Sequence, residues 1–444
     1  MKDVIEPQRR IPVISEPDVL VVGAGAAGLA AACAAARAGV STLLLERYGF
    51  LGGTLAAVTL GGICGAYAVI DEKRLGRVIG GIFRELEERL MHRDALLNPK
   101  RHGRIVGIPY DSVALKLVAE EMVAAHGVEV LFHSLVVGAY ARDGEVDYVV
   151  IENKGGRSAI RPRVVIDCSG DGDVAVHAGA AYRFGDNGTT QFGSTMFRLG
   201  NVDTERAGAL SRSEIRELLE HAVADGHPLP RTTTGVHVNP LQGIVHLNVT
   251  KVCDDQGAPF NLCDPQQLSA AEQVGRQQAF LYESVFREYV PGFENSRIVD
   301  IGAMIGIRET RLVEGERVLT GEMVRGCEKP DDRIACTAWP LEVHEGGRST
   351  RWEFLPDGDY YGIPFGCLVA KGWSNLLVAG RNLSATHEAQ ASARVAAPCM
   401  AMGEAAGIAA ATALREGQAT HQLDIPTLQA RLIDQGALLS PDLR

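Results

Sequence analysis

Residues 19–54 constrain the fold of this chain more than any other segment. They begin with the apolar run VLVV at 19–22, which is typical of a buried parallel strand. The run leads into GAGAAG at 23–28, then into a helix of small residues ending near Arg37, and then into a second apolar run ending at Glu46. A G-x-G-x-x-G motif between a strand and a helix predicts a Rossmann-type βαβ unit.

The three glycines of the motif have separate physical roles. Gly23 permits the tight turn off the strand, Gly25 lets a pyrophosphate approach the backbone, and Gly28 lets the helix pack closely on the sheet. Free N–H groups and the dipole at the helix N-terminus favour the diphosphate anion. Glu46 follows at the spacing of roughly 20 residues where a carboxylate accepts hydrogen bonds from a ribose. The segment therefore predicts a dinucleotide site.

Two other interpretations of this stretch compete with the dinucleotide site. Glycine-rich turns are common, so the motif alone is a weak signal, and only the strand, helix, strand and terminal acid together make it specific. Residues 19–36 also carry no charge and are long enough to cross a bilayer. Their high content of Gly and Ala makes them weakly hydrophobic, and we see no second candidate span. We predict no membrane-spanning segment.

Composition limits the kind of protein further. The 444 residues are enough for two or three domains, and the net charge of −11 argues against nucleic acid as a partner. The nine cysteines are dispersed without any C-x-x-C pair, so we predict no metal site and no redox disulfide. Residues 1–18 contain charges and prolines but no apolar signal-peptide core. We therefore expect a cytoplasmic protein that acts on a small-molecule substrate.

The rest of the chain alternates between two kinds of pattern. β-rich runs at 128–142, 145–153 and 157–166 are separated by turn residues and predict a β-meander. After residue 184, alternating segments and a helix predicted to start at Ser269 suggest an α+β substrate domain. An apolar strand at 375–378, a polar loop at 383–397 and a helix opening at Pro398 then return to Gly-rich α/β material. The predicted divisions are 17–184, 185–350, 351–415 and a C-terminal helical tail at 416–444.

These segments resemble FAD-dependent oxidoreductases of the two-dinucleotide-binding-domain type. More narrowly, they resemble the bacterial FAD-dependent oxidoreductase group that is distantly related to thiazole synthases and heterodisulfide-reductase flavoproteins. The resemblance spans residues 17–415 and is carried by three segments: GAGAAG through ERYGFLGGT, IDCSGDGDVA, and LLVAGRNLSATHEAQASARVAAPCMAMGEAAGIAAA. Two further segments between them, IGIRETRLVEGERVLTGEMV and YYGIPFGCLV, also match the pattern of the group. The resemblance implies FAD as the cofactor. It also implies an α/β fold, in which a Rossmann-like FAD-binding domain of parallel sheet plus β-meander contains an inserted α+β substrate domain.

The resemblance also implies where the cofactor contacts this chain. At the adenosine end, the resemblance places Gly23, Gly25, Ala26, Ala27 and Gly28 at the diphosphate, Glu46 at the adenosine ribose, and Arg47 and the backbone of Val136 at the adenine. Towards the flavin, it places Gly53 and Thr54 at the diphosphate or ribitol, and Gly380 with Asn382 at the ribitol. Cys168, Ser169 and Gly170 match the second nucleotide-binding segment. Many related flavoproteins have Gly-Asp where this chain has Gly380-Arg381-Asn382, so Asn382 is expected to bond the ribitol unless another residue does. The helix opening at Pro398 is expected to direct its N-terminus at the flavin.

The expected reaction is hydride transfer from a small polar organic substrate to the flavin. His344 and His387 are the candidate bases because imidazoles titrate near neutrality, and Arg394 is the candidate substrate anchor. Arg308 belongs to a charged cluster that is the reserve candidate, and His246 is interpreted as a sheet residue. The alternative is a redox-neutral or structural FAD protein of the thiazole-synthase or isomerase kind, or an electron-transfer subunit. The electron acceptor and a homo-oligomeric state stay open.

Overall fold

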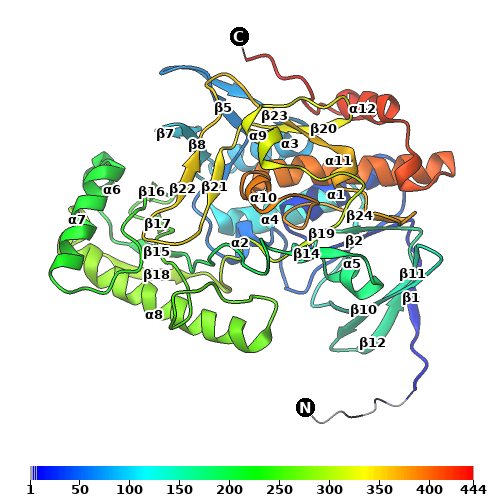
Figure 1. Cartoon of the computed structure of the whole chain (residues 1–444), viewed down its shortest axis with the longest axis horizontal. Helices are drawn as coiled ribbons and strands as arrows, with labels where there is room; N and C mark the ends of the chain where they lie inside the picture. Colours follow the sequence, from blue (N-terminus) through cyan, green and yellow to red (C-terminus); the bar gives the residue numbers. More distant parts are fainter. Residues whose placement is uncertain (1–3, 5, 7, 444) are drawn as a thin grey trace.

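The computed structural model describes residues 4, 6 and 8–443, and a five-stranded parallel sheet lies at its centre (Figure 1). The strands follow the order β24 (Leu376–Val378), β13 (Val164–Asp167), β2 (Val19–Val22), β3 (Thr42–Leu45) and β9 (Glu129–Leu131). Every residue of β2, β3, β13 and β24 is buried, which is why these strands appear in the sequence as continuous apolar runs. The predicted Rossmann-like sheet is confirmed.

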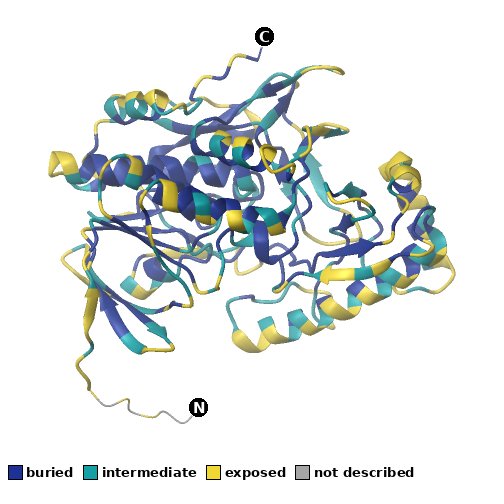
Figure 2. Cartoon of the chain, turned by 180° about the vertical axis from the view of Figure 1, so that it is seen from behind, coloured by how far each residue is buried: buried dark blue, intermediate teal, exposed yellow. Residues whose placement is uncertain are grey.

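Two helices of small residues, α1 (Ala26–Arg37) and α11 (Ala396–Glu416), pack on each other beside this sheet. A Cβ at Gly403 would lie 2.0 Å from the carbonyl oxygen of Ala27, and one at Gly407 would lie 2.3 Å from that of Ala31. The helices therefore touch backbone to backbone, at a separation that only glycine allows. Both appear as buried helices at the centre of Figure 2.

By length and composition, helix α11 could cross a membrane, but 89% of its most apolar stretch is buried inside the protein. Its contact with α1 accounts for that apolar character. The expectation that the sequence has no second candidate span was therefore wrong by length and composition, and the first candidate, the uncharged stretch at 19–36, is divided between β2 and α1.

The predicted β-meander is present with shorter strands. It consists of β10 (Leu135–Arg142), β11 (Glu145–Asn153) and β12 (Gly156–Ile160), and β1 (Val13–Ser15) pairs in parallel with β12. The first and third predicted runs were too long, because β9 and β13 at their ends join the central sheet instead. A short helix, α5 (Asp173–Ala178), follows β13.

A long segment lies between β3 and β9 in the chain, and its helices pack on α1 and α11. It contains α2 (Thr54–Ala57), β4 (Ile63–Cys64), β5 (Tyr67–Val69), β6 (Leu75–Arg77), α3 (Gly81–Met91), β7 (Lys100–His102), β8 (Ile105–Ile108) and α4 (Ser112–Ala125). The side chain of Asp111 caps α4 by accepting a hydrogen bond from the amide of Val113.

An antiparallel sheet with its own apolar core forms the inserted part, at the lower left of Figure 1. Its elements are β15 (Phe197–Gly200), α6 (Thr204–Ala209), α7 (Arg212–Ala224), β16 (His237–Val238), β17 (Val245–Leu247), α8 (Pro265–Tyr289) and β18 (Arg297–Ile301). The predicted start of the long helix at Ser269 was wrong. Asp264 caps it, and Pro265 occupies its first position.

After the inserted part, the chain rejoins the main apolar core at Leu319, whereas we expect the FAD domain to resume at residue 351. Before that point, β14 (Tyr182–Phe184) pairs with β19 (Arg311–Val313). The elements that follow are α9 (Gly321–Arg325), β20 (Arg333–Thr337), β21 (Leu341–Val343), β22 (Arg351–Glu353), β23 (Tyr361–Pro364), η1 (Phe365–Cys367), α10 (His387–Ala393), η2 (Thr420–Gln422) and α12 (Ile425–Asp434). The predicted polar loop at 383–397 contains α10, which Thr386 caps. Part of the N-terminal stretch at 1–18, on which the cytoplasmic prediction rests, lies outside the described residues.

A buried carboxylate on α11 predicts a pH-dependent stability. Glu404 is 2% exposed, and burial raises its pKa to about 7 although the Ile82 amide and Arg37 both bind the carboxylate. Between pH 4.5, the ordinary value, and about 7, the folded state holds a proton that the unfolded state has lost. The free energy of unfolding should therefore fall as pH rises through this window.

Glu404→Gln keeps an acceptor for Ile82 but has no proton to lose. Its free energy of unfolding relative to the wild type should rise by roughly 2–3 kcal/mol between pH 4.5 and pH 8 in urea titrations. Glu88→Gln, at an exposed position on α3, is the matched control. An identical pH dependence for Glu404→Gln and the wild type would contradict the prediction.

Candidate active site

A cavity of about 610 Å³ lies where the central sheet meets the inserted part. Its wall includes residues at or just beyond the carboxyl ends of four parallel strands: Val22, Glu46, Cys168 and Ala379. Ligands of open α/β sheets bind at this edge. From there the cavity extends to His237 and His246 of the inserted sheet and to the hairpin β21–β22.

The N-terminus of α1 opens into this cavity. Its N-cap is Gly25, no side chain caps the helix, and its first residues, Ala26 and Ala27, line the wall. A Cβ at Gly25 would approach only the Cα of Gly53, at 3.9 Å, so the space in front of the helix is open. Unpaired N–H groups beside open space fit the diphosphate of a dinucleotide.

The carboxylate of Glu46 is held in place at the end of β3. It is 5% exposed, and its two oxygens accept hydrogen bonds from the amides of Ala24 (2.8 Å) and Tyr48 (2.9 Å). Each oxygen keeps a further lone pair, and Glu46 lines the cavity. The arrangement fits a ribose hydroxyl pair.

Most of the residues predicted to contact the cofactor line this cavity. They are Gly23, Gly25, Ala26, Ala27, Glu46, Arg47, Gly53, Thr54, Val136, Cys168, Ser169, Gly170 and Gly380. Gly28 lies behind the wall, where a Cβ would come within 1.7 Å of the carbonyl oxygen of Gly23. Its role is to let α1 leave the turn.

Asn382 does not line the cavity, contrary to the expectation for the ribitol. Its side chain donates to the carbonyl oxygen of Asp167 (3.1 Å) and so ties the ends of β13 and β24 together. Arg381 lines the cavity in its place, with its guanidinium against Gly170 and donating to Asp171 at 2.8 Å. Where related flavoproteins have Gly-Asp, this chain therefore places on the cavity wall an arginine that is ion-paired with Asp171.

Pro398 does not open α11 and does not line the cavity either. The helix begins two residues earlier, at Ala396, and Pro398 packs beside Gly65. Val395 and Ala396 line the wall, and no side chain caps this helix end. An uncapped helix N-terminus therefore lies at the cavity, with Val395 and Ala396 rather than Pro398 at its tip.

The far end of the cavity contains a chain of hydrogen bonds on the hairpin β21–β22. Glu342 Oε1 lies 3.1 Å from His344 Nε2, and Thr350 Oγ1 lies 3.3 Å from His344 Nδ1. Arg231 donates to Thr350 at 3.2 Å, so the threonine hydroxyl donates onward to the imidazole. All four residues line the cavity.

Burial and the neighbouring charges set the protonation states of His344 and Glu342 in this hydrogen-bond network. Burial, and next the nearby Arg308, hold the pKa of His344 well below its ordinary value, against the opposing effect of Glu342. Burial alone would raise the pKa of Glu342, but His344, Arg394 and Arg308 bring it below its ordinary value. The imidazole is therefore neutral near pH 7 and able to accept a proton next to an ionised carboxylate.

Arginines give this end of the cavity an excess of positive charge. Arg308 is fixed by bonds to the carbonyl oxygen of Phe192 and to Asn248. Arg394 lines the cavity, and its buried Nε and Nη2 atoms have no hydrogen-bond partner in the described chain. A buried, unpaired guanidinium is a binding group for an anion.

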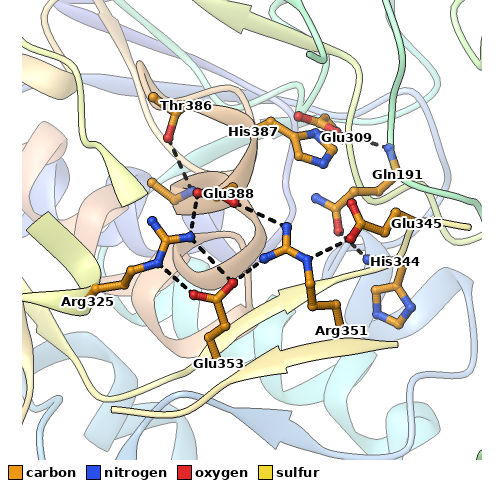
Figure 3. Close-up of polar contacts among 11 residues, drawn as sticks. Gln191, Glu309, Arg325, His344, Glu345, Arg351, Glu353, Thr386, His387 and Glu388 are labelled. Atoms are coloured by element: carbon orange, nitrogen blue, oxygen red, sulfur yellow. Dashed lines mark hydrogen bonds and ion pairs between the residues drawn. The ribbon is translucent and has the colours of Figure 1, made fainter. Parts of the chain in front are cut away.

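His387 lies outside the lining of the cavity, so the structure does not place it as a base. Its Nδ1 is 2.7 Å from Glu309 Oε2; burial would lower its pKa, but Glu309 raises it above the ordinary value (Figure 3). Glu309 also accepts from the amide of Gln191, whose side-chain oxygen accepts from the amide of His344. His387 thus stands behind the wall that carries His344.

An ion-pair network fixes the hairpin that carries His344 and Thr350 (Figure 3). Arg351 on β22 binds Glu345 at 2.6 Å and Glu388 of α10 at 3.2 Å. Arg325 of α9 binds Glu353 at 2.6 Å and Glu388 at 2.7 Å. The hairpin is therefore joined to two helices that pack on the main core.

Several residues of the cavity were not anticipated. Arg212 occupies the first position of α7, Arg231 and Thr350 lie in loops, and His102 and His237 lie on short strands. None has a periodic neighbourhood or motif that marks it in the sequence. His246, predicted as a sheet residue, is one and also lines the cavity. Within residues 4, 6 and 8–443, no group of three or more His, Cys, Asp or Glu side chains is arranged to hold a metal ion.

The parallel sheet, the open N-terminus of α1 and the carboxylate at the end of β3 define a dinucleotide-binding protein of the Rossmann class. The chain belongs to the FAD-dependent oxidoreductase family, whose model matches residues 18–432. It is an enzyme, and FAD is its cofactor.

Solved structures resemble this chain at low sequence identity. CabE, an aromatic hydroxylase from angucycline biosynthesis, matches with a TM-score of 0.51 and 14% identity, over 95% of this chain and 68% of that one. The p-nitrophenol 4-monooxygenase PnpA from Pseudomonas putida DLL-E4 matches with a TM-score of 0.48 and 14% identity, over 95% of this chain and 84% of that one. A geranylgeranyl bacteriochlorophyll reductase-like protein from Thermoplasma acidophilum matches with a TM-score of 0.46 and 14% identity, over 95% of this chain and 83% of that one.

Substitutions at two glycines of the motif should separate cofactor binding from folding. Gly25→Val puts a side chain into open space in front of α1, so it should weaken FAD binding by more than about 100-fold, or about 2.7 kcal/mol, and leave a folded protein. Gly28→Ala forces a Cβ onto the carbonyl oxygen of Gly23, so it should disrupt the fold itself. FAD content by absorbance and fold by circular dichroism check both. A Gly25→Val protein with full FAD content would contradict the placement of the diphosphate.

Proposed function

We propose that this enzyme oxidises a small polar organic substrate by transferring a hydride from it to FAD, which supplies the two-electron acceptor when bound. Arg394 holds the substrate, and His344 receives the departing proton through Thr350. The observation that supports this most is the hydrogen-bond chain from Glu342 through His344 to Thr350, which ends on the wall of a cavity that also contains the unpaired guanidinium of Arg394.

The hydrogen-bond donors define the direction of proton movement. Thr350 accepts from Arg231 and donates to Nδ1 of His344, so the ring proton is on Nε2 and faces Glu342. One lone pair of the threonine oxygen stays free for a substrate hydroxyl. As the substrate O–H proton moves to Thr350, the proton of Thr350 moves to Nδ1. The imidazolium that results lies against the carboxylate of Glu342, which stabilises it.

The electrons and protons balance with FAD as the oxidant. The substrate carbon loses hydrogen with its electron pair, the substrate oxygen loses a proton, and the carbon–oxygen bond becomes a carbonyl. The positive potential around Arg394 and Arg308 holds an anionic group of the substrate and keeps it oriented.

Anaerobic mixing of the holoenzyme with a panel of small hydroxy acids and other polar metabolites tests this function. At least one member should bleach the flavin absorbance of the wild type. With that compound, His344→Gln should slow bleaching by roughly 10²–10⁴-fold, because the proton then has no base. Thr350→Val should also slow it, because the relay is interrupted.

His387→Gln is the matched histidine control and should change the bleaching rate far less than His344→Gln, because His387 lies outside the cavity lining. Each variant is compared at equal FAD content and with an unchanged flavin spectrum. A panel in which nothing bleaches the flavin, or a His344→Gln variant as fast as the wild type, would refute the proposal.

A further inference from the structure

The end of the cavity that contains His344 has more positive charge than one anionic group would neutralise. Arg212, Arg231, Arg308 and Arg394 all line it together with the carboxylate of Glu342. Arg216 also reaches the wall, but it forms an ion pair with Glu220 at 2.7 Å and is largely exposed. Arginine stays charged when buried, so this end of the cavity has a clear excess of positive charge.

The four guanidinium groups divide into two kinds. Arg231 and Arg308 are fixed by protein acceptors: Arg231 donates to Thr233, Thr350 and the carbonyl oxygen of Asn248, and Arg308 donates to Phe192 and the Asn248 side chain. Arg394 and Arg212 make no side-chain hydrogen bond or ion pair to any other residue of the described chain, but their surroundings differ: Nε and Nη2 of Arg394 are buried without a partner, whereas Arg212 is exposed. Two guanidinium groups thus have their donors free.

The two free guanidinium groups come from different parts of the fold. Arg394 follows α10 and directly precedes the N-terminus of α11, and its carbonyl oxygen lies 3.2 Å from Sγ of Cys399. Arg212 begins α7 of the inserted part and lies by Gly235, on the same wall as His237. The fixed pair, Arg231 and Arg308, and His344 line the same cavity. A ligand in this cavity therefore meets two guanidinium groups that have no protein partner.

We propose that the substrate is a small dicarboxylate. Arg394 binds the carboxylate next to the carbon that is oxidised, and Arg212 binds the second carboxylate. This inference rests on the proposed function for the identity of the reacting group, but the binding of two carboxylates does not depend on turnover. The fixed arginines strengthen the positive potential and pair with no ligand atom themselves. A charge-assisted bond from one carboxylate accounts for the buried, unfilled donors of Arg394, and the exposed Arg212 on the same cavity wall is available to the other carboxylate.

Binding of unreactive acids to the oxidised holoenzyme tests the inference. Malonate, succinate and glutarate, which differ in carboxylate spacing, are compared with butyrate at pH 7.5 and constant ionic strength by calorimetry and flavin difference spectra. The best-fitting dicarboxylate should bind about 10–100-fold more tightly than butyrate, because it gains a second charge-assisted pair. Equal binding of butyrate and all three dicarboxylates would overturn the inference.

Variants assign the two carboxylates. Arg212→Gln should remove the preference for the dicarboxylate and leave butyrate binding unchanged, whereas Arg394→Gln should weaken both. Arg212→Lys should keep part of the preference, because it keeps the charge. Arg206→Gln, an exposed residue of α6 that pairs with Glu294, is the control for net charge and should change neither affinity. An Arg212→Gln enzyme that keeps the full preference would overturn the inference.

The two proposals fail separately. If dicarboxylates bind through Arg212 and no hydroxylated dicarboxylate such as malate bleaches the flavin, the anion site is supported and hydride transfer is refuted. If a monoanionic compound bleaches the flavin and dicarboxylates show no preference, the hydride transfer is supported and the dicarboxylate inference is overturned.

Discussion

The backbone contact between α1 and α11 is the constraint on which the site depends. Gly403 meets the carbonyl oxygen of Ala27, and Gly407 meets that of Ala31, so the two helices run in the same direction at glycine spacing. Parallel packing puts both N-termini at the same edge of the sheet, and neither is capped by a side chain. Two partial positive charges therefore face one cavity, where a diphosphate and a negatively charged substrate are both favoured.

The second half of the site depends on a hairpin rather than on the sheet. β21–β22 carries Glu342, His344 and Trp352 to the cavity wall, and ion pairs from Arg325 and Arg351 join it to α9 and α10. Since these helices pack on the same core as α1, the hydrogen-bonded residues Glu342, His344 and Thr350 are held in a fixed position relative to the nucleotide end of the cavity. The inserted sheet closes the other side.

Local patterns predicted the nucleotide half of the molecule well, because the chemistry there is carried by the backbone. The apolar strands, the glycine turn and Glu46 are close in sequence, and each has a conformation that few other residues allow. Prediction was weaker at helix boundaries: the cap at Asp264 moved the start of α8, and a short helix replaced a polar loop before α11. Asn382 was assigned to the ribitol because related flavoproteins carry Gly-Asp where this chain has Gly380-Arg381-Asn382, but its side chain bonds the end of β13.

By itself, the sequence determined the Rossmann unit, the β-meander and a dinucleotide site, since strand period, glycine spacing and turn residues act over short distances, and FAD in particular followed from the family resemblance. His344 and Arg394 were candidates in the sequence, but only the tertiary structure decided which side chains lie with them at that end of the cavity. Arg212, Arg231 and Thr350 are separated by long stretches of chain, and each has an ordinary local environment in the sequence. Whether a guanidinium is fixed by a carbonyl or left free, and whether an imidazole is neutral, depends on burial and partners that distant segments supply.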